Sequence, residues 1–195
     1  MNEDVDTMEK RAPDMAAMVP YWNKTDAIVE GQDAVRNARQ TYLPKFADET
    51  SDEYDVRLGL TKMTNIYRDT VEGLASKTFE EEISVVETTK PVPEEIKKFI
   101  EDVDGDGNNL TSFASLTFFN GINSAIDWIL IDYPVVDRDK IRTVADKKAS
   151  GIKPYWTHVL GRNVLEARTI MNNGKRQLSY VRIFEPGLGE QDHIR

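Results

Sequence analysis

The chain contains no cysteine among its 195 residues. Disulfides, thiolate zinc sites, iron–sulfur clusters and cysteine nucleophiles are therefore excluded. Histidine is scarce as well, because only His158 and His193 occur. Two imidazoles are too few for a His-rich metal site, and they leave only two candidates for the base of a Ser-His-Asp triad. We therefore expect a protein that is not an enzyme and that uses no cofactor.

Long apolar segments are also missing. The longest apolar run covers residues 128–131, far fewer than the roughly 20 residues with which a helix spans a bilayer. The first residues are acidic and polar, so they lack the apolar core of a secretory signal. We expect no membrane association and no export by such a signal.

Positive charge is in deficit. Lys and Arg number 25 against 34 Asp and Glu, which gives a formal net charge of −9. A protein that grips DNA through its phosphates needs clustered basic side chains, so this balance argues against that mode of binding. The negative charge is compatible with a protein that lets DNA move past it, because negative charge on the protein weakens the binding of negatively charged DNA.

Apolar periodicity predicts a helical first half. Pro20 suits the first turn of a helix that ends at Gly31, and Thr50 with Glu53 has the spacing of a capping box at the start of another helix. Two short helices are predicted over residues 20–30 and 33–39, and a long helix from the capping box to about Ala75, with a bend at Gly59. Three more are predicted from Pro93 to Val103, from Leu110 to beyond Asn120, and over the charged segment 137–150, which is expected to lie on the surface.

Strand signals gather towards the end of the chain. The predicted strands cover residues 83–86, 128–131 and 155–160, and the two arms 165–171 and 177–184 of a hairpin. The run 128–131 is too apolar for an exposed edge strand. Asn173-Gly174 lies between these arms and favours a tight turn. We expect an α+β fold, with a helical N-terminal half followed by a small mixed sheet that ends in a β-hairpin. Residues 1–13 are expected to form a mobile acidic arm, and residues 14–195 a single domain.

An aspartate-rich turn is the most conspicuous motif. Asp102, Asp104 and Asp106, followed by a glycine, match the first ligand positions of a calcium loop. The position that should supply a bidentate Glu is Phe113, and the apolar eighth position is Asn109. Asp, Gly and Asn are also the residues that a turn between two helices requires. We therefore interpret the segment as such a turn, with a small calcium-responsive binding module as the alternative.

Other polar groups point to ordinary structure. Asp127 and Asp132 flank the apolar strand, but their five-residue spacing turns them to opposite faces, so they are not expected to form an acid–base pair. Basic and acidic residues alternate over 138–148, which is typical of a solvated helix face.

Four blocks of residues, in this order, resemble the phage portal-like family, whose members are related to the portal proteins of tailed phages. The first block consists of Tyr21-Trp22, residues 28–35 and Tyr42-Leu43-Pro44, and the second of Asn65, residues 68–74 and Phe79. The third consists of residues 102–105, Gly107-Asn108 and residues 110–114, and the fourth of residues 130–134 and Lys153-Pro154-Tyr155. The resemblance runs from Tyr21 to the hairpin.

The resemblance implies a structural virion protein. Such a subunit forms a dodecameric ring, the head–tail connector at one capsid vertex, through which double-stranded DNA is packaged and ejected without sequence-specific binding. Its partners are other copies of itself, the capsid, terminase and head-completion proteins, and it is located in the host cytoplasm during assembly and then in the virion. The chain resembles the outer, wing-type region, and the stem and clip regions are expected beyond Arg195. A defective prophage remnant without function is a further alternative.

Overall fold

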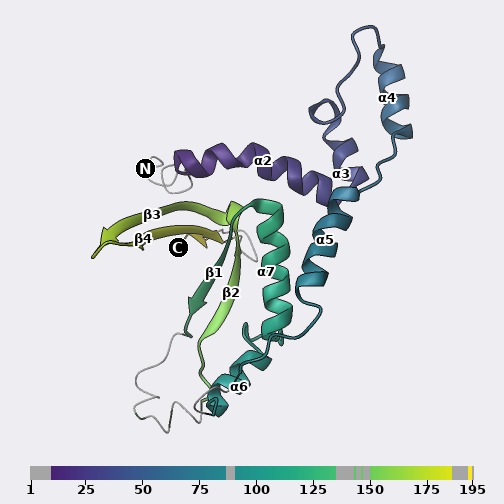
Figure 1. Cartoon of the computed structure of the whole chain (residues 1–195). Coiled ribbons are helices and arrows are strands. Elements are labelled where there is room, and N and C mark those ends of the chain that lie inside the picture. Colours follow the sequence, from purple (N-terminus) through teal and green to yellow (C-terminus); the bar gives the residue numbers. More distant parts are fainter. Residues whose placement is uncertain are drawn as a thin grey trace.

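The computed structural model describes residues 10–86, 91–134, 143, 146 and 150–185, together with the backbone of residues 193–194. Helices occupy the first part of the chain and strands the last part (Figure 1). The fold class is therefore α+β, as expected. Residues 1–9 of the predicted acidic arm lie outside the described residues. Close to the expected boundary at Pro13, the amide of Ala12 donates to the carbonyl of Leu165 in β3 at 2.8 Å.

Helix α2 (Pro13–Glu30) begins seven residues earlier than the prediction and contains Pro20 in its interior. Met15 and Trp22 lie on either side of Pro20, and both are buried in the same hydrophobic cluster. Pro20 itself is exposed, so water can satisfy the carbonyl group that the proline leaves unpaired. Packing on both sides therefore outweighs the local cost of the proline. The helix ends as predicted at Gly31, whose φ is 105°.

Helix α3 (Gln32–Asn37), the short 3₁₀ helix η1 (Arg39–Thr41) and helix α4 (Ser51–Leu60) form a projecting arm (Figure 1). The capping box of Thr50 and Glu53 starts α4, as predicted. The long helix expected to run to Ala75 is instead two helices, because α4 ends at Leu60 and α5 covers Ile66–Thr78. Asn65 caps the start of α5 by accepting from the amide of Arg68 at 3.0 Å. The break therefore lies at 61–65 and not at Gly59.

Helices α6 (Glu94–Glu101) and α7 (Leu110–Ser124) follow, separated by the aspartate-rich turn. Strands β1 (Asp127–Asp132) and β2 (Tyr155–Leu160) form one antiparallel pair. After the short helix η2 (Gly161–Asn163), strands β3 (Val164–Asn172), β4 (Lys175–Glu185) and β5 (His193–Ile194) form a second sheet, with β4 in the middle. In place of the single mixed sheet that was expected, the strands form two antiparallel sheets, of two and three strands.

Several strand predictions have separate outcomes. The hairpin is confirmed, and Asn173 and Gly174 form its turn with φ values of 50° and 75°. Strand β2 is confirmed as well. Residues 83–86 are not a strand. Strand β1 exists, but it belongs to a two-stranded sheet and exposes Ile129 and Ile131 at 44% and 66%, so the expectation that it is too apolar for an exposed edge was wrong. The helix predicted over 137–150 lies almost entirely outside the described residues.

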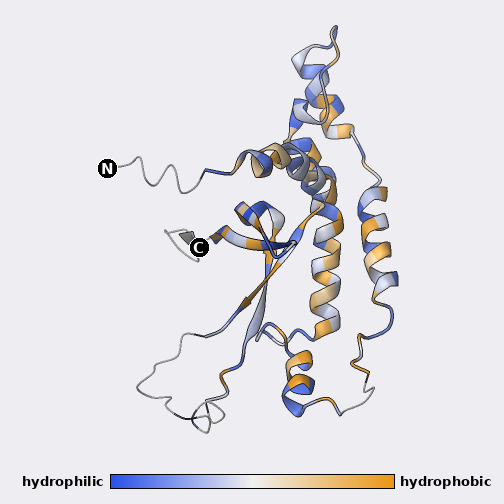
Figure 2. Ribbon diagram, turned by 60° about the vertical axis from the view of Figure 1, so that its left-hand side comes forward, coloured by the Kyte–Doolittle hydropathy of each residue, from blue (hydrophilic) through white to orange (hydrophobic). Residues whose placement is uncertain are grey.

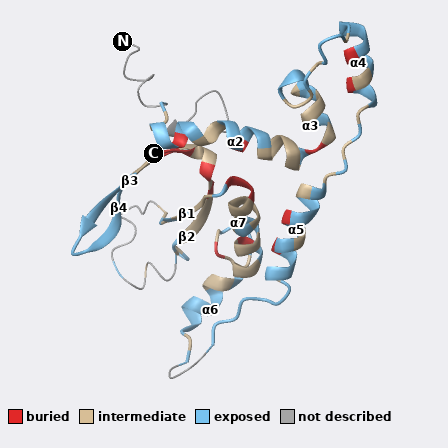
Figure 3. Cartoon of the chain, turned by 45° about the horizontal axis from the view of Figure 1, so that its top comes forward, coloured by how far each residue is buried: buried red, intermediate tan, exposed pale blue. Residues whose placement is uncertain are grey.

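A hydrophobic cluster joins α2 to the two sheets. It contains Met15, Trp22, Val159, Val164 and Ile183. Figure 3 shows buried residues as small, separated groups, and Figure 2 shows hydrophobic residues continuing along β1 and α7. The core is therefore thin for a chain of this length. Among the described residues, no helix is both long and apolar enough to cross a bilayer.

Candidate functional site

The aspartate-rich turn satisfies its carboxylates from its own backbone. Asp102 Oδ1 accepts from the amides of Gly105 at 2.8 Å and Gly107 at 3.0 Å. Asp104 Oδ1 accepts from the amide of Asp106 at 2.9 Å, and Asp104 Oδ2 accepts from the side chain of Asn108 at 2.6 Å. These are the hydrogen bonds with which Asp stabilises a tight turn.

Lys153, which precedes β2, completes the turn from a distant part of the chain. Its Nζ donates to the carbonyl oxygen of Asp102 at 2.8 Å and to Asp102 Oδ2 at 2.9 Å. The ammonium group, followed by the amide of Gly107, lowers the pKa of the Asp102 carboxyl below its ordinary value. The buried Val103 accepts from the amide of Trp156 at 2.8 Å, which joins the turn to β2.

The geometry of the turn fits a structural role better than a calcium site. Lys153 places a positive charge on Asp102, the residue that would be the first ligand. Phe113, at the position of the missing bidentate ligand, is buried with its ring 5.8 Å from Trp156. Among the described residues, no group of three or more His, Asp or Glu side chains is arranged to hold a metal ion. Asp106 belongs to no such group.

The two aspartates that flank β1 lie at opposite ends of the ladder, opposite Leu160 and Tyr155. Asp132 Oδ2 accepts from the hydroxyl of Tyr155 at 3.3 Å. Asp127 Oδ2 instead contacts His158 Nε2, and the side chains of Asp127 and His158 are only 4% and 16% exposed. The sequence analysis missed this pair, because the contact depends on which strand lies beside β1. In the described part of the chain, the hydrogen bond of His158 is to Asp127, and no serine or threonine hydroxyl is bonded to its ring in the way that a triad requires.

A second polar cluster, also missed, joins three helices and η2. Asp26 of α2 forms an ion pair with Arg162. The side-chain amide of Asn123 donates to Asp26 Oδ1 at 2.8 Å and accepts from the hydroxyl of Tyr67 at 3.2 Å. Burial raises the pKa of Tyr67. Asn123 is itself buried, so these two hydrogen bonds satisfy a side-chain amide that would otherwise lose its hydrogen bonds to water.

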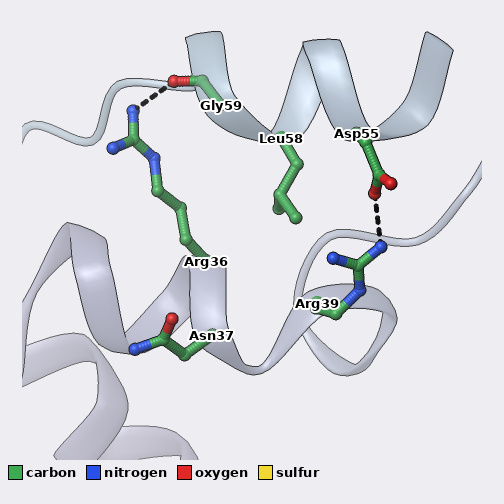
Figure 4. Close-up of a pocket in the computed structure, with 6 residues that line it drawn as sticks. All are labelled: Arg36, Asn37, Arg39, Asp55, Leu58 and Gly59. Carbon is green, nitrogen blue, oxygen red and sulfur yellow. Dashed lines mark hydrogen bonds and ion pairs between the residues drawn. The ribbon is translucent and has the colours of Figure 1, made fainter. Parts of the chain in front are cut away.

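A shallow hollow between α3 and α4 contains two arginines whose charges are already engaged (Figure 4). Arg36 donates to the carbonyl oxygen of Gly59 at 2.8 Å and to that of Thr61 at 3.1 Å, which caps the end of α4. Arg39 forms an ion pair with Asp55. The hollow therefore offers no uncommitted cation for an anionic ligand.

The residues that carry the family resemblance meet in pairs. Asn65 of the second block donates to the carbonyl of Ile28 of the first block at 2.5 Å. Gln32 of the first block accepts from the amide of Met63, beside the second block, at 3.2 Å. The contact of Lys153 with Asp102 joins the fourth block to the third. These contacts therefore join distant segments of the fold.

No family model matches the chain, and no curated protein matches it.

Proposed function

We propose that the chain is a non-enzymatic structural subunit of a portal-like ring in a tailed phage. Copies of the subunit assemble at one capsid vertex, and double-stranded DNA passes through the ring during packaging and ejection. Capsid, terminase and head-completion proteins contact the assembled ring. The protein belongs to the host cytoplasm during assembly and to the virion afterwards.

The distribution of hydrophobic side chains carries this proposal. Within the described residues, more large hydrophobic side chains are exposed than hydrophobic side chains are buried. The exposed ones lie on separate elements, with Ile66 of α5 at 69%, Leu116 of α7 at 49%, Ile131 of β1 at 66% and Met171 of β3 at 67%. Such side chains supply apolar surface that a subunit can bury where a partner covers several of them together. A ring supplies such partners on both sides of each subunit.

The ordered sequence blocks support the same proposal. Their residues cap helices, close turns and join distant segments, as Asn65 and Lys153 do. A family whose shared residues maintain an architecture is more easily understood as structural than as catalytic. The acidic balance of the chain, −9 in formal charge, fits a conduit that must not hold DNA tightly.

Mass photometry and negative-stain electron microscopy of the full chain, over a range of protein and salt concentrations, test the proposal. We expect closed rings, with twelve subunits as the resemblance implies. Monomers at every concentration and salt condition would overturn the proposal. Tight binding of double-stranded DNA by the monomer would also contradict it, because a conduit requires weak adhesion.

A further inference from the structure

We infer that Asn173, in the turn of the β3–β4 hairpin, is a site of spontaneous chemical modification. Its side-chain amide is converted to a carboxylate through a cyclic imide formed with Gly174, and the isoaspartate product opens the end of the hairpin. The site is independent of the proposed function, because the reaction needs only water and the folded chain.

The reaction joins the side chain of Asn173 to the main chain. The backbone nitrogen of Gly174 attacks Asn173 Cγ and forms a C–N bond, while the Cγ–Nδ2 bond breaks and ammonia leaves with the proton of the attacking amide. Glycine favours the attack, because it has no Cβ atom to crowd the ring or to restrict the backbone. Water then opens the ring. Cleavage between Cγ and the nitrogen gives aspartate, whereas cleavage at the backbone carbonyl carbon gives isoaspartate, in which the main chain runs through Cγ.

Asn-Gly occurs twice in the chain, once in the hairpin turn and once as Asn120-Gly121 inside α7. In α7 the amide of Gly121 belongs to the hydrogen-bond ladder of the helix. The side-chain amide of Asn120 donates to the carbonyl oxygen of Leu116 at 2.9 Å. The buried Phe113 and Asn123 hold the helix in place on either side. The nitrogen of Gly121 therefore reaches the side chain of Asn120 only if α7 opens.

The hairpin turn leaves the other Asn-Gly accessible. Asn173 and Gly174 are exposed, with φ values of 50° and 75°. The neighbouring Asn172 donates from its side-chain amide to Gln177 Oε1 at 3.0 Å. Within the described residues, the side-chain amide of Asn173 has no such partner. Water and the following backbone nitrogen can therefore approach Asn173 Cγ.

The end of the hairpin also opens at low cost. Every residue from Arg168 to Tyr180 is exposed, so neither face of this part of the hairpin is covered within the described chain. The strand register is irregular between Arg168 and Thr169. A two-stranded hairpin without a covered face is marginally stable, and segments with few buried contacts open far more often than a packed helix does. Asn173 therefore samples the conformations that the attack requires, whereas Asn120 is held in α7.

Isoaspartate changes the geometry of the turn. It adds a methylene group to the main chain between residues 173 and 174, inside a turn that is closed by the pair of Asn172 and Lys175. A two-residue turn with positive φ at both central positions accepts Asn-Gly or Asp-Gly, but its spacing depends on a main chain of ordinary length. We expect this pair and the next one, Met171 with Arg176, to separate in the isoaspartate form.

Peptide mapping by mass spectrometry tests the site. The full chain is incubated at mildly alkaline pH, folded and in urea, and conversion is followed at Asn173 and at Asn120, which serves as the internal control. In the folded chain we expect Asn173 to convert at least about tenfold faster, the ratio that about 1.4 kcal/mol of difference in opening free energy produces. In urea the two rates should be similar, because the dipeptide is the same. Equal rates in the folded chain, or an unchanged ratio in urea, would overturn the inference.

NMR spectroscopy tests the effect on the hairpin. Cross-strand contacts between Met171 and Arg176 report the pairing beside the turn. We expect these contacts to be lost in chains that carry isoaspartate at position 173 and to persist in Asn173→Asp, which has the new charge on a main chain of ordinary length. Contacts that are retained in both, or lost in both, would contradict an opening caused by the linkage.

Discussion

Lys153 binds Asp102 twice, through the carbonyl oxygen at 2.8 Å and through carboxylate Oδ2 at 2.9 Å. The two residues are far apart in the sequence, and the contact joins the turn between α6 and α7 to the start of β2. The same side chain therefore closes the turn and supplies the positive charge that a calcium ion would supply in a calcium loop.

Replacing Lys153 with methionine removes the ammonium group and keeps the length of the side chain. We expect the pKa of Asp102 to rise towards its ordinary value, because the hydrogen bond from Lys153 is the largest cause of its lowering. NMR titration of the Asp102 carboxyl measures this change. Lys62→Met, at an exposed position, is the matched control and should leave the Asp102 titration unchanged. An unchanged pKa in Lys153→Met would show that the turn alone lowers it.

Calcium should have no effect on the stability of the unmodified protein. A ligand that binds only the folded state raises the melting temperature with concentration, but here Lys153 already neutralises the first acidic position and Phe113 replaces the bidentate ligand. Differential scanning calorimetry with up to millimolar Ca²⁺, with Mg²⁺ as the ionic control, measures the shift. A melting temperature that rises with Ca²⁺ alone would favour the calcium-responsive module.

The pair of Glu49 and Arg57 should make the projecting arm sensitive to acid. Arg57 donates to both carboxylate oxygens of Glu49, at 2.7 Å and 2.8 Å, and lowers the pKa of Glu49 from 4.5 to about 2. Because the folded-state pKa is the lower one, the pair stabilises the fold above pH 4.5, and this contribution is lost as the pH falls towards 2.

Urea unfolding of the unmodified chain and of Arg57→Ala, at pH 7 and at pH 3, measures this effect. The difference in unfolding free energy between the two should be smaller at pH 3. Arg68→Ala, which breaks the exposed pair of Arg68 with Glu72, is the control and should change stability little. A difference that does not depend on pH would assign the role of Arg57 to its stacking on Phe46, 4.4 Å from the ring centroid.

Two glycine-to-alanine substitutions should have opposite effects on stability. A Cβ atom at Gly161 would lie 2.5 Å from the carbonyl oxygen of Ile126, so Gly161→Ala must move backbone and is expected to destabilise the fold by about 1–3 kcal/mol. A Cβ atom at Gly59 in α4 meets nothing within 4 Å, so Gly59→Ala should stabilise by roughly 0.5–1 kcal/mol. Chemical denaturation measures both. Equal effects would contradict the close approach of η2 to Ile126.

Predictions that depend on neighbouring residues were confirmed. The capping box of Thr50 and Glu53 and the Asn173-Gly174 turn involve groups a few residues apart, so their geometry follows from local backbone chemistry. Predictions of helix bounds that depend on packing were wrong at two places. The interior Pro20 reflects the packing of Met15 and Trp22 against the distant core residues Val159, Val164 and Ile183, and the break between α4 and α5 coincides with the hydrogen bond from Asn65 to Ile28.

The sequence by itself determined the α+β class, the local caps and turns, and the exclusion of cysteine chemistry, because composition and short-range spacing decide these features. Only the tertiary structure decided the non-local contacts, such as Asp127 with His158 and Lys153 with Asp102. Periodicity tells which face of an element is apolar, but not which element covers it. For the same reason residues 83–86 were predicted as a strand from their own pattern, whereas strand formation also requires a neighbouring edge, which the described part of one copy does not supply.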